Sequence, residues 1–214
     1  MTHQTLLSNH LEDLHGSGLS DETITRWGCY SITADQRWVM NQLGFGHIEP
    51  PVLALPVLPP GLTEPNLNDV ITKPDRPRRD GKGWQIKYET RPHAPNRIHV
   101  PLCYRDLMAD ATVPLWVTEG QKKAEKAAQE GLTCIAPPGV WNWLSRISSD
   151  VSIPLPDFYL IEFKRREDCV VFDSDSATNP SVRLASRRLA EFLTQRGAEV
   201  YRVQLPEGAD GYEE

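Results

Sequence analysis

The sequence predicts an α/β fold: a mainly parallel sheet flanked by helices, with a smaller N-terminal α+β subdomain. Two observations favour this class. From Pro114 onward, short apolar runs typical of buried strands alternate with helical segments, which is the pattern of a parallel sheet with crossover helices. Before that point, short apolar runs are separated by long polar and proline-rich stretches, which indicate short strands and loops. We therefore expect three regions, at residues 1–27, 28–110 and 111–214.

The first region should be a helical segment. Ser20 has the side chain of an N-cap residue for a short second helix, which should end before Gly28. Two glycines within residues 16–18 interrupt the helical pattern before it. The apolar face of the first helix is formed by Leu6, Leu7, Leu11 and Leu14.

The middle region should be a small α+β subdomain of short strands and long loops. Residues 50–65 are rich in proline, which favours extended chain and is excluded from helix interiors. The same region contains most of a basic segment that is described below.

The third region should contain four strands, at residues 115–117, 132–136, 169–172 and 199–203. Helices are expected at residues 121–130 and 181–196, closed by Gly131 and Gly197. Asn179 and Pro180 fit the N-cap and the first position of the second helix. Its buried stripe would be Val182, Ala185, Leu189, Phe192 and Leu193. Residues 141–147 should form a short helix or a loop.

Three carboxylates follow two of these strands. Glu119 comes after the strand at 115–117, and Asp173 and Asp175 come after the strand at 169–172. Parallel strands place their carboxyl ends along one edge of a sheet, so the three side chains can converge there. Carboxylate oxygens are the ligands that Mg²⁺ and Mn²⁺ prefer. Taken singly, Glu119 could instead be a first-turn acid of the next helix, and the aspartates could be turn formers.

The charge of the chain is segregated. The net charge is −6, yet residues 73–99 hold eight lysines or arginines and only three acids. Such a basic segment is typical of a surface that follows phosphates, although a solvated loop is the plainer alternative. Its candidate nucleic-acid contacts are Arg76, Arg78, Arg79, Lys82 and Lys87.

Further candidates lie near the carboxylates and in the basic segment. Lys122 and Lys123 occupy the first turn of a helix, where positive charge opposes the helix dipole, so a bound phosphate would explain them. Simple exposure is the alternative. Tyr88, Trp141 and Trp143 could stack on bases, but aromatic side chains at such positions are more often packed in the protein.

The carboxylate pattern resembles the Toprim domain of bacterial primases, topoisomerases and overcoming-lysogenization-type nucleases. It is carried by Glu119 in Thr-Glu-Gly, a following helix, Gly139, and Asp173-Ser-Asp175. The strings Pro114-Leu-Trp-Val-Thr-Glu-Gly-Gln-Lys-Lys-Ala124 and Pro138-Gly-Val-Trp-Asn-Trp143 are similar to an uncharacterised plasmid and phage family of primase-like proteins. The resemblance covers about residues 114–206. It implies a Rossmann-like Toprim sheet and, more weakly, a primase-like middle region.

This resemblance implies a primase-like nucleotidyltransferase domain that acts in the replication of plasmids, phages or mobile elements. Asp173 and Asp175 would hold Mg²⁺ or Mn²⁺, and Glu119 would complete metal binding or act as general acid and base. The expected partners are single-stranded DNA or RNA template, nucleoside triphosphates and a replicative helicase. A Toprim metal-dependent nuclease and an inactive nucleic-acid-binding module that serves a helicase are the alternatives. Family members generally continue into a Lys-Gly-x-Asp-Asp-like segment, so we expect the Toprim domain to be truncated at its C-terminal end.

Composition fits a cytoplasmic protein. No apolar run approaches the roughly 18 residues that a membrane span needs, and the first residues are polar. The four cysteines are scattered without a Cys-x-x-Cys pair, which favours neither a disulfide framework nor a zinc ribbon.

Overall fold

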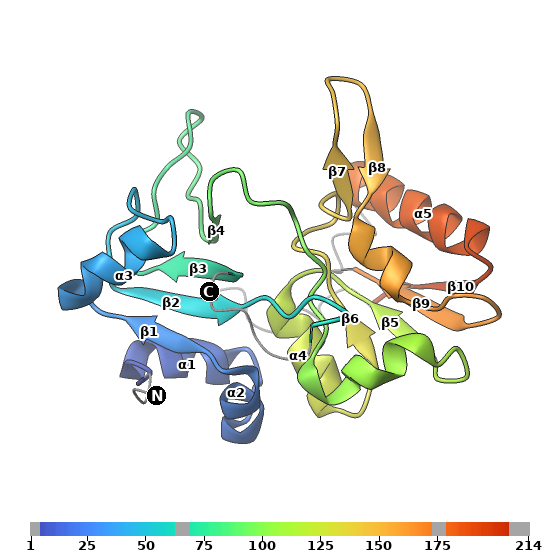
Figure 1. Ribbon diagram of the computed structural model, residues 1–214, viewed down its shortest axis with the longest axis horizontal. Coiled ribbons are helices and arrows are strands. Elements are labelled where there is room, and N and C mark those ends of the chain that lie inside the picture. The colour runs from blue at the N-terminus through green and yellow to red at the C-terminus, as the bar shows by residue number, and fades with distance from the viewer. Residues whose placement is uncertain (1–4, 63–68, 173–178, 206–214) are drawn as a thin grey trace. The chain divides into compact units, whose positions relative to one another are not determined.

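The computed structural model describes residues 5–62, 69–172 and 179–205, and Figure 1 shows the elements. The chain forms two compact units: Met1–Leu58 with Thr63–Pro95, and Pro59–Leu62 with Asn96–Glu214. The boundaries predicted from the sequence lie after residues 27 and 110, whereas this division falls after Pro95. The difference arises because the segment after Pro95 joins the second unit, where His99 and Ala136 form an antiparallel bridge.

The first unit is a small antiparallel sheet with helices. Its strands are β1 (Tyr30–Ile32), β2 (Val52–Pro56), β3 (Val70–Pro74) and β4 (Glu89–Thr90), and they are paired in the order β1-β2-β3-β4. Its core is formed mainly by side chains of β1, β2 and the segment that precedes β2, including Ile32, Phe45 and Val52.

Helices α1 (Ser8–Gly16) and α2 (Asp21–Trp27) confirm the predicted helical segment. The Ser20 side chain accepts a hydrogen bond from the backbone N–H of Thr23, and Gly28 ends α2 in the left-handed conformation with φ of 80°. Helix α3 (Arg37–Gln42) was not predicted. Its signal was a capping box at Thr33 and Gln36, which starts the short 3₁₀ helix Ala34–Gln36 immediately before it.

The second unit confirms the predicted parallel sheet. Strands β5 (Leu115–Val117), β6 (Cys134–Ile135), β9 (Glu167–Val171) and β10 (Glu199–Val203) are all parallel and lie in the order β10-β9-β5-β6. Helix α4 (Gln121–Gln129) follows β5, and α5 (Pro180–Gln195) packs against β9 and β10. A mixed α/β fold with a parallel sheet and helices is therefore shown.

The start of α5 agrees with the N-cap and first helical position predicted from the sequence. The Asn179 side chain accepts a hydrogen bond from the Ser181 N–H at 3.0 Å, and Pro180 is the first helical residue, as predicted. The predicted stripe faces the core: Val182, Ala185, Leu189 and Leu193 are buried, and Phe192 is partly buried against them.

The prediction for residues 141–147 is wrong in its second half. Leu144–Arg146 is strand β7, which forms an antiparallel hairpin with β8 (Ser152–Pro154). Strand pairing with residues farther along the chain overrides the local pattern here. Two 3₁₀ helices, Leu102–Ala109 and Pro156–Leu160, complete the unit.

None of the helices in the described parts of the chain is both long and apolar enough to cross a membrane.

Candidate functional site

The candidate site lies at the carboxyl edge of the parallel sheet. β5 and β9 are adjacent parallel strands, with Val117 opposite Val170, so both strands end at the same edge. Glu119 lies two residues beyond the end of β5. The neighbouring strand ends supply the arrangement on which the predicted site depends.

The chain at Glu119 is fixed by hydrogen bonds on both sides. The Thr118 N–H donates to Ile135 O at 3.0 Å, and the Gly120 N–H donates to Pro137 O at 3.1 Å. Gly120 has φ of 77°, in the left-handed region, while an added Cβ would meet no atom within 4 Å. Backbone conformation, not crowding, therefore favours glycine at this turn from β5 into α4.

Glu119 is not a first-turn acid. Gly120 is the N-cap of α4 and the first turn contains no acidic residue, so Glu119 precedes the helix. The Glu119 side chain is 17% exposed, and its Oε1 lies 3.3 Å from Nζ of Lys123 one helical turn later. The alternative that Glu119 only complements the dipole of α4 from its first turn is therefore wrong. Lys123 has a local partner in Glu119, which accounts for its position near the start of α4.

Asp173 and Asp175 lie outside the described residues, so their convergence with Glu119 stays a prediction. Among the residues that are described, no group of three or more His, Cys, Asp or Glu side chains could hold a metal ion. The three predicted ligands fit Mg²⁺ or Mn²⁺ by type, because all are carboxylates, and Glu119 is positioned at the edge that the pair of strands shares.

The loop after β6 borders the same edge through the Gly120–Pro137 hydrogen bond. Within it, the Asn142 N–H donates to Gly139 O at 2.9 Å. A Cβ at Gly139 would lie 3.1 Å from Nδ2 of Asn142, so the close turn favours glycine.

The two tryptophans of this loop pack inside the unit. Trp143 is 4% exposed and stacks on Phe192 at a ring distance of 5.6 Å, which rules out stacking on a base. The Trp141 indole N–H donates to Oγ of Ser181 at 3.0 Å, and Arg188 lies over its ring at 5.7 Å. Trp141 therefore covers the start of α5.

A buried side-chain hydrogen bond that the sequence does not reveal holds α4. Nε2 of His99 lies 2.9 Å from Oε1 of Glu125, and both side chains are 1% exposed. The second carboxylate oxygen of Glu125 is buried without a hydrogen-bond partner in the described part of the chain. No local pattern could reveal the pair, because 26 residues separate its members.

The five candidate basic residues are all exposed, and two of them also bond to other groups of the protein. Arg78 donates to both carboxylate oxygens of Glu89, at 2.6 and 2.9 Å, and Glu89 is 5% exposed. This bond raises the pKa of the Arg78 guanidinium and gives Arg78 a structural role. Arg79 donates to Gly83 O at 2.7 Å and is exposed, as are Arg76, Lys82 and Lys87.

Two other members of the basic segment are also ion-paired. Lys73 pairs with Asp13 in the first unit. Arg97 belongs to the second unit and donates to both oxygens of Asp157, at 3.1 and 3.0 Å. The charge available for a phosphate backbone is therefore concentrated between β3 and β4, in the first unit.

The fold is similar to that of bacterial primase cores. One similar structure is the Aquifex aeolicus primase, zinc-binding and RNA polymerase domains, with a TM-score of 0.64 and 13% identity over 95% of this chain and 51% of that one. Another is the DnaG catalytic core, with a TM-score of 0.57 and 15% identity over 96% of this chain and 67% of that one. The chain thus spans about half the length of the Aquifex protein structure. At these identities, the likeness shows the fold alone.

Residues 103–214, just over half of the chain, match the family described as domain of unknown function DUF3854, and the chain belongs to that family. No curated protein matches the sequence.

Proposed function

We propose that the chain is a primase-like nucleotidyltransferase domain of the Toprim type, which transfers nucleotides on a single-stranded template. One observation carries the proposal. In a fold similar to primase cores, the adjacent parallel strands β5 and β9 end at one edge, and Glu119 stands at that edge. The template would be DNA or RNA and the second substrate a nucleoside triphosphate.

Each residue at the edge has a proposed task. Asp173 and Asp175, with Glu119, would hold Mg²⁺ or Mn²⁺, which when bound supplies charge neutralisation on the nucleotide phosphates. Lys122, in the first turn of α4, would bind a phosphate of the triphosphate at the start of this helix, with Lys123 next to it. Glu119 would accept or return a proton, and its ion pair with Lys123 orients the carboxylate.

The first unit would hold the template. Arg76, Arg79, Lys82 and Lys87 would contact phosphates, while Arg78 supports this surface through its bond to Glu89. We further propose a cytoplasmic role in the replication of a plasmid, phage or mobile element beside a replicative helicase, in line with the sequence resemblance.

The test is nucleotide incorporation by the whole chain on a single-stranded template, with Mg²⁺ or Mn²⁺. We expect wild-type protein to synthesise product and Asp173→Asn/Asp175→Asn to lose both synthesis and Mn²⁺ binding in calorimetric titration. Asp150→Asn, which changes an exposed acid elsewhere in the second unit, is the matched control.

The outcomes separate the alternatives. Degradation of labelled DNA without nucleotides would identify a nuclease instead. Salt-sensitive DNA binding with neither activity would identify a binding module that serves a partner such as a helicase. Equal Mn²⁺ affinity in wild type and the double variant would contradict the metal site.

A further inference from the structure

We propose that Trp84, at the tip of the basic loop between β3 and β4, stacks on an unpaired base of a single-stranded nucleic acid whose phosphates contact Lys82 and Lys87. The basic loop comprises residues 76–88. The inference rests on the proposed function, because it assigns a base-contacting residue to the proposed template surface.

The Trp84 side chain is 74% exposed, although an indole is among the largest apolar groups a protein carries. Such exposure on a loop whose other exposed residues are mostly charged or polar indicates a binding role more than a packing role. Figure 1 shows the loop rising from the end of β3 and returning to β4.

The tip of the loop is a turn held by hydrogen bonds. Oδ1 of Asp80 accepts hydrogen bonds from the N–H groups of Lys82 and Trp84, at 2.8 and 2.9 Å. The Asp80 N–H donates to Trp84 O at 2.8 Å, and Arg79 donates to Gly83 O at 2.7 Å. These bonds fix the backbone on both sides of Trp84, which lowers the entropy that binding would cost.

The base of the loop is fixed as well. Arg79 and Gln85 form an antiparallel bridge, and the Ile86 N–H donates to Arg78 O at 2.8 Å. The bidentate Arg78–Glu89 pair closes the loop onto β4.

The charge of the loop selects the ligand. The acids in and beside the loop already have partners in the protein: Asp80 accepts from turn amides, Glu89 is buried against Arg78, and Asp75 accepts from the Asn9 side chain. Lys82 and Lys87 are exposed on either side of Trp84. Cations that flank an exposed aromatic ring are the combination that binds single-stranded nucleic acid, since the ring stacks on bases and the cations meet phosphates. A duplex offers phosphates but no free base face, and an acidic protein offers charge but no base.

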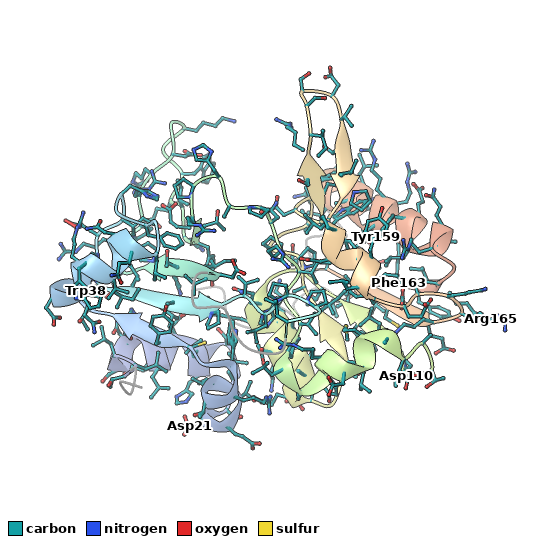
Figure 2. All side chains as sticks on the ribbon, viewed as in Figure 1. Asp21, Trp38, Asp110, Tyr159, Phe163 and Arg165 are labelled. Atoms are coloured by element: carbon teal, nitrogen blue, oxygen red, sulfur yellow. The ribbon has the colours of Figure 1, made fainter. Side chains whose placement is uncertain are left out.

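The experiment is fluorescence anisotropy of the whole chain with a labelled single-stranded oligonucleotide, without nucleotides or metal. We expect Trp84→Leu to weaken binding roughly tenfold or more, as loss of one base stack does, and Trp84→Phe to retain most of the affinity. Trp38→Leu is the matched control, because Trp38 is also an exposed tryptophan of the first unit, 59% exposed on α3 outside the basic loop (Figure 2).

An oligonucleotide without bases keeps the test independent of folding. Wild-type protein should bind the base-free oligonucleotide about as weakly as Trp84→Leu binds the intact strand. The affinity of Trp84→Leu should fall little further when the bases are removed. The slope of log K against log[salt] should be unchanged in Trp84→Leu, whereas Lys82→Gln/Lys87→Gln should flatten it by about 0.7 for each lost contact.

The inference is overturned if wild-type protein binds no single strand, if it binds both oligonucleotides equally, or if folded Trp84→Leu matches wild type. Competition by polyglutamate as effective as that by the oligonucleotide would indicate an acidic protein partner instead. Trp84-dependent binding without nucleotide incorporation would refute only the proposed function, and incorporation without Trp84-dependent binding would refute only this inference.

Discussion

Asp168 shows how the sheet tolerates a carboxyl group in its interior. It lies in β9, is 0% exposed, and neither of its oxygens receives a hydrogen bond from a described residue. Burial raises the pKa of Asp168 to about 7, although the Arg166 guanidinium beside it acts in the opposite direction. Arg166 is itself fully buried and donates to backbone carbonyls of four residues, Leu107, Met108, Val113 and Glu162. Its role is to join these segments, not to neutralise Asp168 through a direct bond.

The raised pKa makes stability depend on pH. Between about pH 4 and 7 the unfolded chain releases a proton that folded Asp168 keeps, so the free energy of unfolding of the wild type falls as pH rises. Asp168→Asn removes the ionisable group and with it this decrease in the free energy of unfolding. The variant should therefore have a free energy of unfolding about 1–3 kcal/mol higher than wild type at pH 8, with a smaller difference at pH 5. Urea unfolding at both pH values measures it. Glu167→Gln, an exposed neighbour, is the control, and equal differences at the two pH values would contradict the prediction.

Glu119 supports a second prediction at this scale. If it moves a proton, Glu119→Gln should slow nucleotide incorporation by roughly 10²- to 10⁴-fold, while single-stranded DNA affinity stays the same or rises slightly because a negative charge is lost. Primer-extension rates and anisotropy measure the two effects. Glu130→Gln is a matched control, since Glu130 also pairs with a lysine four positions away on α4. Full activity of Glu119→Gln would leave catalysis to the two aspartates.

The candidate site was only partly predictable from single residues. Glu119 could be selected because its position after an apolar strand is a local feature. The structural role of Arg78 could not be predicted in this way, because it depends on Glu89, which is 11 residues away. Glu89 becomes buried only when β4 pairs with β3.

Helix α4 owes its position to contacts beyond its own sequence. Ala124 and Ala128 are buried on its inner face, and the buried Glu125 on that face meets His99. His99 in turn is bridged to Ala136, so the helix, the segment before residue 100 and the edge of the sheet are joined. Because Gly120 is the N-cap of α4, this connection also positions the start of the helix beside Glu119.

Removal of one member of the pair should therefore destabilise the second unit. His99→Leu leaves the Glu125 carboxylate buried without its partner and should cost about 3–5 kcal/mol. Glu125→Gln keeps a hydrogen-bonding group and should cost less. Chemical denaturation measures both, and the double variant His99→Leu/Glu125→Leu should recover much of the loss. A His99→Leu protein as stable as wild type would show that the pair does not hold α4.

At the scale of the whole molecule, each compact unit has its own hydrophobic core. The first core lies on the antiparallel sheet and the second on the parallel sheet, under α5. The family match and the candidate carboxylates belong to the second unit, whereas the basic loop belongs to the first. The proposed chemistry and the proposed template contact thus depend on separately packed structures.

The strand order gives a prediction for the molecule as a whole. β5 and β9 have a strand on both sides, while β10, among the described residues, is paired only with β9. Backbone amides of the paired central strands should exchange with solvent far more slowly than those of β10, because opening the centre requires unfolding of the sheet. Hydrogen exchange followed by mass spectrometry tests this, with β2 and β1 as the matching central and edge strands of the first unit. Equal protection of β10 and β5 would contradict the order.

Local sequence signals are sufficient to predict the elements that depend on neighbouring residues. Ser20 and Asn179 mark helix starts, Gly28 ends a helix, and the apolar stripe of α5 faces the core, because caps and periodicity act within a few residues. β10 was located correctly for the same reason.

Which of these elements are neighbours depends on the folded chain. The order β10-β9-β5-β6 and the pairs Arg97–Asp157 and His99–Glu125 join residues that are far apart in the chain. The β7–β8 hairpin and the Arg78–Glu89 pair join residues 6 to 11 positions apart, which is still beyond the reach of caps and helical periodicity. Their formation depends on long-range pairing and on burial, which convert an ordinary surface charge into a structural contact. Trp84 was overlooked for a related reason: a tryptophan is usually packed inside, and only the folded loop reveals that this one faces solvent.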